Sequence, residues 1–186
     1  DRGVNICRAL SLPPAHLIGD RDSAAHDAWA WAEEHGARVH AFPPAKDFTD
    51  TELALRIAAE LMPRALVILT GAFGGRFDHL MSAASVAAHA ALPCILADER
   101  EALFFLHGDE SLTITCDSPP QAISLLPFTE ECTGITTNGL RWELNHAQIH
   151  THSSTTISNV LAEGNTEHRF SVTLGSGILG VYLCHK

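Results

Sequence analysis

The sequence lacks any apolar run of the roughly 18 residues that a membrane-spanning helix requires, and it has no signal-peptide or lipidation pattern. We therefore expect no membrane association. Basic residues are also scarce, since 12 Lys and Arg face 22 Asp and Glu, for a net charge of −10 with His neutral. Because such a surface repels a nucleic-acid backbone, we expect no nucleic-acid partner. A metal ion can still bridge the protein to a small anionic ligand.

Cysteine motifs are absent as well. The five cysteines form an odd set with no C-x-x-C spacing, which indicates reduced, mostly buried thiols in a cytoplasmic protein. The twelve histidines form no H-E-x-x-H motif and no tight His/Cys group, so we expect no zinc site. The sequence begins at Asp1 without a methionine, inside what resembles a working segment, and we expect further chain upstream.

Helix and strand signals alternate in the first half. Short apolar segments predict strands near residues 17–18, 38–42, 66–70 and 94–97, and the segment 66–70 is typical of a strand buried on both faces. Between them we predict helices over residues 24–35, from a cap at Thr49 to Pro63, and over residues 77–92. This alternation favours an α/β domain over residues 1–108, with an open, mainly parallel sheet and flanking helices.

Beyond about residue 107 the chain changes character. Short runs rich in Thr, Ser and Val are separated by turn clusters such as Thr137-Asn138-Gly139. We predict strands at residues 112–116, 122–126, 141–144, 148–152, 170–174 and 178–183. An all-β domain of sandwich type over residues 109–186 is the natural interpretation.

The motif GDRDS at residues 19–23 lies between a predicted strand and a predicted helix. In an open parallel sheet that is the carboxyl edge, where ligands bind. Asp20 and Asp22 repel each other unless a cation joins them, and their hard oxygens suit Mg²⁺ held together with phosphate oxygens. The alternative is a solvated turn in which Asp22 and Ser23 cap the next helix.

Residues 46–50 (KDFTD) have the same strand–loop–helix setting. Asp50 falls in the first helical turn, so favourable helix capping is its structural explanation. Asp47 has no such explanation. Lys46 beside it suits a site that holds phosphate and metal together, although a plain surface charge is the commonest fate of lysine.

The segment 71–79 follows the apolar strand and opens a helix. Gly74 and Gly75 let backbone N–H groups approach an anion, and Arg76 can fork onto phosphate oxygens. Asp78 and His79 complete the group, with His79 expected to bond the local backbone. The spacing fits neither of the common glycine-rich phosphate motifs, so a structural turn remains the alternative.

Trp142, Ser158 and Asn159 stand out in the predicted β domain. An exposed indole can stack on a flat heterocycle, including a cationic one. A tryptophan on a strand is more often part of the core, and the residues alone favour that interpretation for Trp142.

Taken together, these segments resemble the thiamin pyrophosphokinase family. Residues 1–3 (DRG), GDRDS, KDFTDTE at 46–52 and GGRFDH at 74–79 occur in the family's order, followed by GLRWEL at 139–144 and Ser158-Asn159. The combination and its order along nearly the whole chain carry the resemblance. The family also has a strand and a glycine-bearing turn before the position of Asp1.

The resemblance implies a nucleotide-binding α/β domain, a β-sandwich and a homodimer with active sites at the subunit interface. It implies ATP, Mg²⁺ and thiamin, with thiamin diphosphate and AMP as products. The implied catalytic carboxylates are Asp20, Asp22, Asp47 and Asp50, of which the first three are the metal ligands. The implied nucleotide-binding residues are Ser23, Lys46, Gly74, Gly75, Arg76, Asp78 and His79. Trp142 would cover the thiamin rings from the partner subunit, with Ser158 and Asn159 nearby, which reverses the core interpretation.

Two alternatives stay open. One is a non-catalytic module that senses a nucleotide or thiamin. The other is a kinase-like enzyme that acts on a different flat heterocyclic alcohol.

Overall fold

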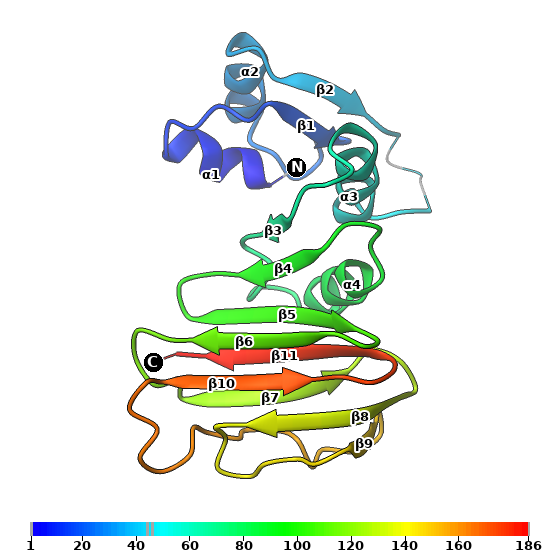
Figure 1. The fold of residues 1–186 in the computed structure, drawn as a ribbon. Helices are drawn as coiled ribbons and strands as arrows, with labels where there is room; N and C mark the ends of the chain where they lie inside the picture. The colour runs from blue at the N-terminus through cyan, green and yellow to red at the C-terminus, as the bar shows by residue number, and fades with distance from the viewer. Residues whose placement is uncertain (1, 44, 46, 186) are drawn as a thin grey trace. The chain divides into compact units, whose positions relative to one another are not determined.

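The computed structural model describes residues 2–43, 45 and 47–185. The chain divides into two compact units, residues 1–65 and 66–186, and Figure 1 labels their elements. Within the described residues, no helix is both long and apolar enough to cross a membrane.

The first unit is built around the parallel strands β1 (His16–Gly19) and β2 (Arg38–Ala41). Parallel neighbours need a crossover connection, and helix α2 (His26–Glu34) supplies it. Its Trp29 and Ala32 are buried together with Leu17 of β1 and with Val4 of helix α1 (Gly3–Ala9). Helix α3 (Asp50–Leu61) follows β2 and contacts β1.

The second unit contains two sheets formed by its described residues. In spatial order, the five-stranded sheet consists of β3 (Val67–Leu69), β4 (Cys94–Ala97), β5 (Glu101–His107), β11 (Ile178–Cys184) and β7 (Ala122–Pro127). The four-stranded sheet consists of β6 (Ser111–Thr115), β10 (Arg169–Thr173), β8 (Glu131–Asn138) and β9 (Ala147–His150). Strands β3 and β4 are parallel, and the other neighbours are antiparallel. The protein is thus a mixed α/β structure with several sheets.

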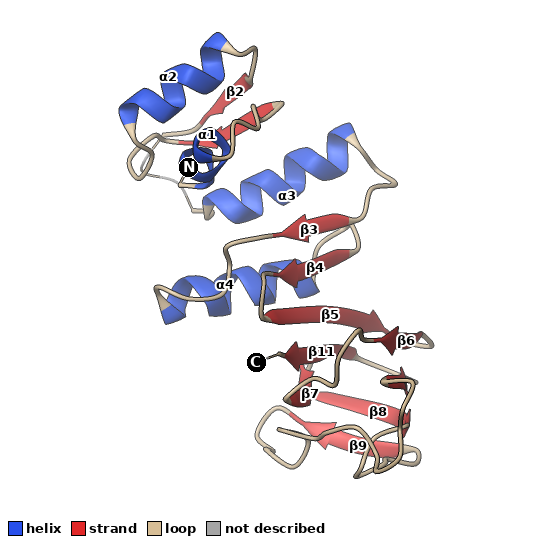
Figure 2. Cartoon of the chain, turned by 90° about the vertical axis from the view of Figure 1, so that its left-hand side faces the viewer, coloured by secondary structure: helices blue, strands red, loops and turns tan. Residues whose placement is uncertain are grey.

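One hydrophobic core serves both sheets of this unit. Ile123 and Val181 of the five-stranded sheet and Ile135 and Val172 of the four-stranded sheet are all fully buried in one cluster. Helix α4 (Phe77–Ala88) packs against β4 (Figure 2). The ring of His107 on β5 bonds the carbonyl of Ala88 at the end of α4, with 2.9 Å between Nε2 and O.

Most predicted elements are confirmed, with three exceptions among the strands. The predicted strand at 141–144 is wrong, because this segment forms bends after Gly139, whose φ is +82°. Strands β5 and β8 were not predicted. In β8 the alternation of side chains is interrupted by a register shift between Cys132 and Ile135, where Gly134 has a φ of +68°.

Two helix boundaries and one burial pattern also differ. Helix α2 begins at His26 with Ala25 as its N-cap, and the N–H of Ala25 donates to the Asn5 side chain at 3.0 Å, so the prediction that Ser23 caps this helix is wrong. Helix α4 ends at Ala88 rather than near residue 92. Strand β3 forms one end of its sheet, and Ile68 is 59% exposed, so burial on both faces is not observed.

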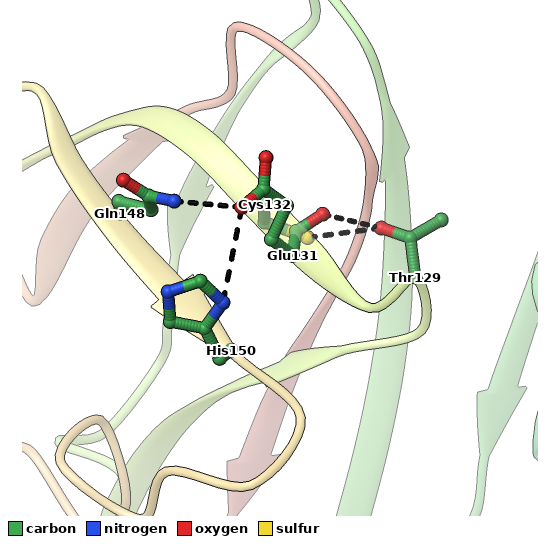
Figure 3. A network of polar contacts seen from close by, with 5 residues as sticks. All are labelled: Thr129, Glu131, Cys132, Gln148 and His150. Atoms are coloured by element: carbon green, nitrogen blue, oxygen red, sulfur yellow. Dashed lines mark hydrogen bonds and ion pairs between the residues drawn. The ribbon is translucent and has the colours of Figure 1, made fainter.

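The turn between β7 and β8 is held by a polar network (Figure 3). The hydroxyl of Thr129 donates to the carbonyl of Glu131 at 2.7 Å and accepts from the backbone N–H of Ile178 at 3.1 Å. The Glu131 carboxylate accepts a hydrogen bond from Gln148 at 2.7 Å and lies 3.8 Å from Nδ1 of His150. The network therefore fastens this turn to the start of β11 and to β9.

Gly177, beside this network, is expected to tolerate no side chain. Its φ is +103°, and a Cβ atom there would lie 2.7 Å from the Thr129 hydroxyl and 2.8 Å from the Glu131 carbonyl. Gly177→Ala should lower the free energy of unfolding by about 1–3 kcal/mol in urea denaturation. Gly108→Ala is the control, because its nearest contact is 3.4 Å, to the carbonyl of Gly175. Equal losses in the two variants would contradict this prediction.

Candidate functional site

The two acidic segments start from the same edge of the β1–β2 sheet. Gly19 and Ala41 are paired at the carboxyl ends of the strands, and the N–H of Phe42 donates to the carbonyl of Gly19 at 3.1 Å. The loops that begin at Asp20 and Phe42 therefore leave side by side from the edge at which ligands bind in parallel sheets.

The turn after β1 holds its own shape. The Asp20 carboxylate accepts a hydrogen bond from the backbone N–H of Asp22 at 3.1 Å. Arg21 adopts a φ of +71°, and its guanidinium reaches the Glu33 carboxylate at 2.6 Å and lies 4.9 Å from the centre of the Trp29 ring. Fastening Arg21 to helix α2 fixes the backbone on either side, where the Asp22 side chain is exposed.

In the second acidic loop, the residue that caps the helix and the residue with the exposed carboxylate are different. Thr49 caps α3, since its hydroxyl accepts the N–H of Glu52 at 3.2 Å, which confirms the predicted cap. Asp50 lies in the first turn of α3, where the helix dipole favours a carboxylate. Asp47 is exposed and outside the helix, and Lys46 lies outside the described residues.

These carboxylates are of the right kind for Mg²⁺. Across the part of the chain that the structure describes, no three His, Cys, Asp or Glu side chains gather into a metal-holding group. Mg²⁺ often takes only one or two carboxylates and completes its shell with water and substrate phosphates. The exposed carboxylates of Asp22 and Asp47 are hard oxygen donors suited to this kind of binding.

The glycine-rich loop joins β3 to α4 in the second unit. Gly74 and Gly75 have φ values of +96° and +75°, which L side chains rarely adopt. A Cβ atom on either would meet no described atom within 4 Å, so the backbone conformation demands glycine while the space beside it is open. Open space before the N-terminus of α4 is favourable for an anion.

Arg76 and Asp78 form a two-pronged ion pair at this helix start. The Nε–Oδ1 distance is 3.1 Å, the Nη2–Oδ2 distance is 2.5 Å, and both side chains are well exposed. The hydrogen bonds from Arg76 lower the pKa of Asp78 to about 2 and raise that of Arg76. An incoming phosphate therefore has to compete with Asp78 for the two N–H donors of the Arg76 guanidinium. His79, in the same turn, is exposed.

An aromatic contact ties the glycine-rich loop to the five-stranded sheet. The ring of Phe73 lies 6.4 Å from that of Tyr182 on β11, centre to centre. The Tyr182 hydroxyl donates to Glu101 at 2.5 Å. Burial raises the pKa of Tyr182, and the bond to Glu101 raises it further, so the phenol keeps its proton. Sequence reasoning missed this group, for which the only signal was that the chain contains a single tyrosine.

Trp142 does not belong to the core. Its side chain is 58% exposed, and the Arg141 guanidinium lies 5.1 Å from its ring centre. The Asn159 amide holds the backbone of Trp142, donating to its carbonyl at 2.8 Å and accepting its N–H at 3.3 Å. The same Asn159 oxygen accepts the N–H of Val160 at 2.9 Å. Asn159 is thus engaged with backbone groups that set the position of Trp142.

Ser158 is attached to the same sheet as the glycine-rich loop. Its φ is +61°, and its N–H donates to the hydroxyl of buried Ser124 at 3.0 Å. Ser124 on β7 is paired with Tyr182 on β11. Directly opposed residues of antiparallel strands point to the same face, so the anchors of Phe73 and Ser158 are neighbours on one face of the sheet.

Comparison with known proteins finds two matching family profiles. The family profile "Thiamin pyrophosphokinase, catalytic domain" matches residues 1–95, and "Thiamin pyrophosphokinase, vitamin B1 binding domain" matches residues 110–179. The chain belongs to the thiamin pyrophosphokinase family. This confirms the family resemblance of its motifs.

Individual members of the thiamin pyrophosphokinase family are similar over most of their length. The thiamine pyrophosphokinase of Bacillus subtilis is 28% identical over 174 residues, covering 92% of this chain and 80% of the relative. Its crystal structure superposes with a TM-score of 0.83 at 26% identity, covering 100% of this chain and 85% of that one. The family protein of Enterococcus faecalis, at 21% identity, shares the fold with a TM-score of 0.84, covering 100% and 86%.

The Arg76–Asp78 pair predicts a specific titration. Because the folded-state pKa of Asp78 lies below the ordinary 3.8, the pair is intact above pH 3.8 and is lost as the pH falls through about 2. In Arg76→Ala the pKa of Asp78 should rise toward 3.8, as followed by the carboxyl ¹³C shift in NMR. Arg8→Ala, which breaks the ion pair with Asp27, should leave Asp78 unchanged. An unchanged Asp78 pKa in Arg76→Ala would show that the pair does not form.

Proposed function

We propose that this chain transfers the pyrophosphoryl group of ATP to the primary hydroxyl of thiamin, giving thiamin diphosphate and AMP. Such a transfer requires the nucleotide and the acceptor alcohol to be held close together and in line. The observation that carries the proposal is the common sheet face to which the Phe73-anchored loop and Ser158 are both attached. Membership of the family, with both profiles matched in order, supports the same reaction.

We also propose the finer architecture of the family for this chain. The parallel pairs β1–β2 and β3–β4 support an open, mainly parallel nucleotide-binding sheet over residues 1–108. The core that the two C-terminal sheets share supports a β-sandwich over residues 109–186. Because β5 pairs with β11 in one sheet, this functional boundary falls inside the second compact unit.

The acidic loops supply the proposed metal ligands, Asp20, Asp22 and Asp47, with Asp50 beside them. A bound Mg²⁺ would neutralise the phosphate oxygens during transfer. The exposed carboxylate of Asp47, or that of Asp20, takes the proton from the attacking thiamin hydroxyl. The free thiols, of which Cys94 and Cys132 are buried, suit a reducing cytoplasm.

The nucleotide phosphates would lie against the start of helix α4. The backbone N–H groups of Gly74 and Gly75, together with the positive end of the α4 dipole, would attract this anion. Arg76 would exchange its bonds to Asp78 for bonds to phosphate oxygens, which stabilise the charge that develops on the transferred group. The further proposed nucleotide contacts are Ser23, Lys46 and His79.

Thiamin would be covered by Trp142, whose exposed indole offers a face for a flat ring and for the positive thiazolium. Asn159 would act by holding the backbone of Trp142, and Ser158 would line the thiamin site of its own chain, beside the glycine-rich loop. We further propose a homodimer in which Trp142 completes the active site of the partner subunit.

The first test is product analysis after incubation with ATP, Mg²⁺ and thiamin. We expect AMP and thiamin diphosphate in equal amounts, and AMP only when thiamin is present. ADP would instead indicate simple phosphoryl transfer to the alcohol. Thiamin binding without any nucleotide product would support the sensor module, which family membership does not favour.

The interfacial site is tested by mixing two inactive variants, Arg76→Ala and Trp142→Ala, after joint unfolding and refolding. If Trp142 serves the partner's nucleotide site, half of the dimers are mixed and each carries one intact site, so about a quarter of wild-type turnover should return. If Trp142 serves its own chain, every site lacks one group. No recovery in dimers whose mixing is verified would therefore exclude the shared site. Refolded wild-type protein is the reference for the yield.

A further inference from the structure

We propose that Tyr182 is a positioning residue that sets the nucleotide-binding conformation of the glycine-rich loop through the ring of Phe73. The inference rests on the proposed function only for the identity of the ligand, a nucleotide with a phosphate chain. Tyr182 itself lies on β11, far along the sequence from the loop, and is not placed in contact with substrate.

The glycine-rich loop needs an anchor because its backbone is inherently free. Gly71, Gly74 and Gly75 all have positive φ, and such residues have the largest conformational freedom to lose on ordering. Arg76, at the end of the loop, is exposed and bonded to Asp78 within the same turn. Phe73, by contrast, is half-buried and reaches outside the loop to Tyr182.

Tyr182 is a firm support for such an anchor. Strand β11 is paired on both sides, with Tyr182 opposite Leu103 of β5 and opposite Ser124 of β7. The hydrogen bond from its hydroxyl to Glu101 fixes the direction of the ring. The separation of 6.4 Å and the interplanar angle of 58° to Phe73 fall within the favourable range for tilted aromatic pairs.

The position of the contact explains why it would affect binding. Phe73 directly precedes Gly74 and Gly75, beside which a Cβ atom would meet no described atom within 4 Å. A site that binds through backbone groups depends on rigid support from neighbouring side chains. Removing this support would keep the backbone groups that bind phosphate, but the loop that carries them would spread over many conformations.

The test measures ATP binding by calorimetry without thiamin, so that no turnover is needed. Tyr182→Leu and Phe73→Leu should each weaken ATP binding roughly five- to tenfold, and the double variant should be no weaker than either, because both remove one contact. Tyr182→Phe keeps the ring and should lose less. In steady state, KM for ATP should rise while KM for thiamin stays within about twofold, since the thiamin residues are untouched.

The matched control is Phe128→Leu. Phe128 is also half-buried in the second unit and pairs edge-on with Phe105 at 5.2 Å, a contact that does not involve the loop. It should lower thermal stability without changing ATP affinity. Unchanged ATP affinity in folded Tyr182→Leu, an additive loss in the double variant, or an equal loss in Phe128→Leu would each overturn the inference.

The outcomes also separate this inference from the proposed reaction. The inference is supported and the reaction refuted if the Tyr182→Leu and Phe73→Leu variants show non-additive losses of ATP affinity while the wild-type protein forms no AMP. AMP formation by a wild type whose ATP affinity does not respond to Tyr182→Leu or Phe73→Leu would support the reaction and refute the inference.

Discussion

The insertion of β11 between β5 and β7 is the constraint on which the second unit depends. This last strand pairs with β5 from Ile178 to Cys184 and with β7 from Leu179 to Cys184. Its alternate residues serve two purposes: Val181 fills the core shared with the four-stranded sheet, whereas Tyr182 on the opposite face meets the glycine-rich loop. Figure 1 shows β11, in red, beside strands from the middle of the chain. The site in this unit therefore forms only when β11 is in place.

Strand β5 pairs with β4 on one side and with β11 on the other, so it joins the two halves of the family fold in one sheet. Ile95 is opposite Phe104, directly after the parallel pairing of β3 with β4. The strand that leads into the glycine-rich loop and the strand that supports Ser158 thus belong to a single sheet. Because a hydrogen-bonded sheet resists shear and separation of its strands, the loop and Ser158 hold a fixed register within this unit. Close positioning of two substrates requires this kind of fixed geometry.

Sequence reasoning succeeded where the signal was local and failed where it depended on distant partners. The capping of α3 by Thr49 and the start of α4 after the glycines are set by residues a few positions apart, and both were predicted. The exposure of Trp142 depends on Asn159, which holds its backbone from another segment, so the residues alone gave the wrong environment. Strand β8 was hidden by its bulge at Gly134. The contact of Phe73 with Tyr182 joins distant segments, and no spacing rule reports it.

Because the chain carries a large negative charge, anion binding depends on its local cationic groups. With a net charge of −10, the protein as a whole repels a polyphosphate, so binding has to come from short-range features. The start of α4 provides one, but its Arg76 is already neutralised by Asp78. Asp78 therefore holds the guanidinium in an ordered, two-pronged geometry while lowering its attraction for weaker anions. Under the proposed function, only a ligand of high charge displaces Asp78 from Arg76 at a net gain. Asp78 thus opposes the binding of weak anions and, under the proposed function, favours a polyphosphate.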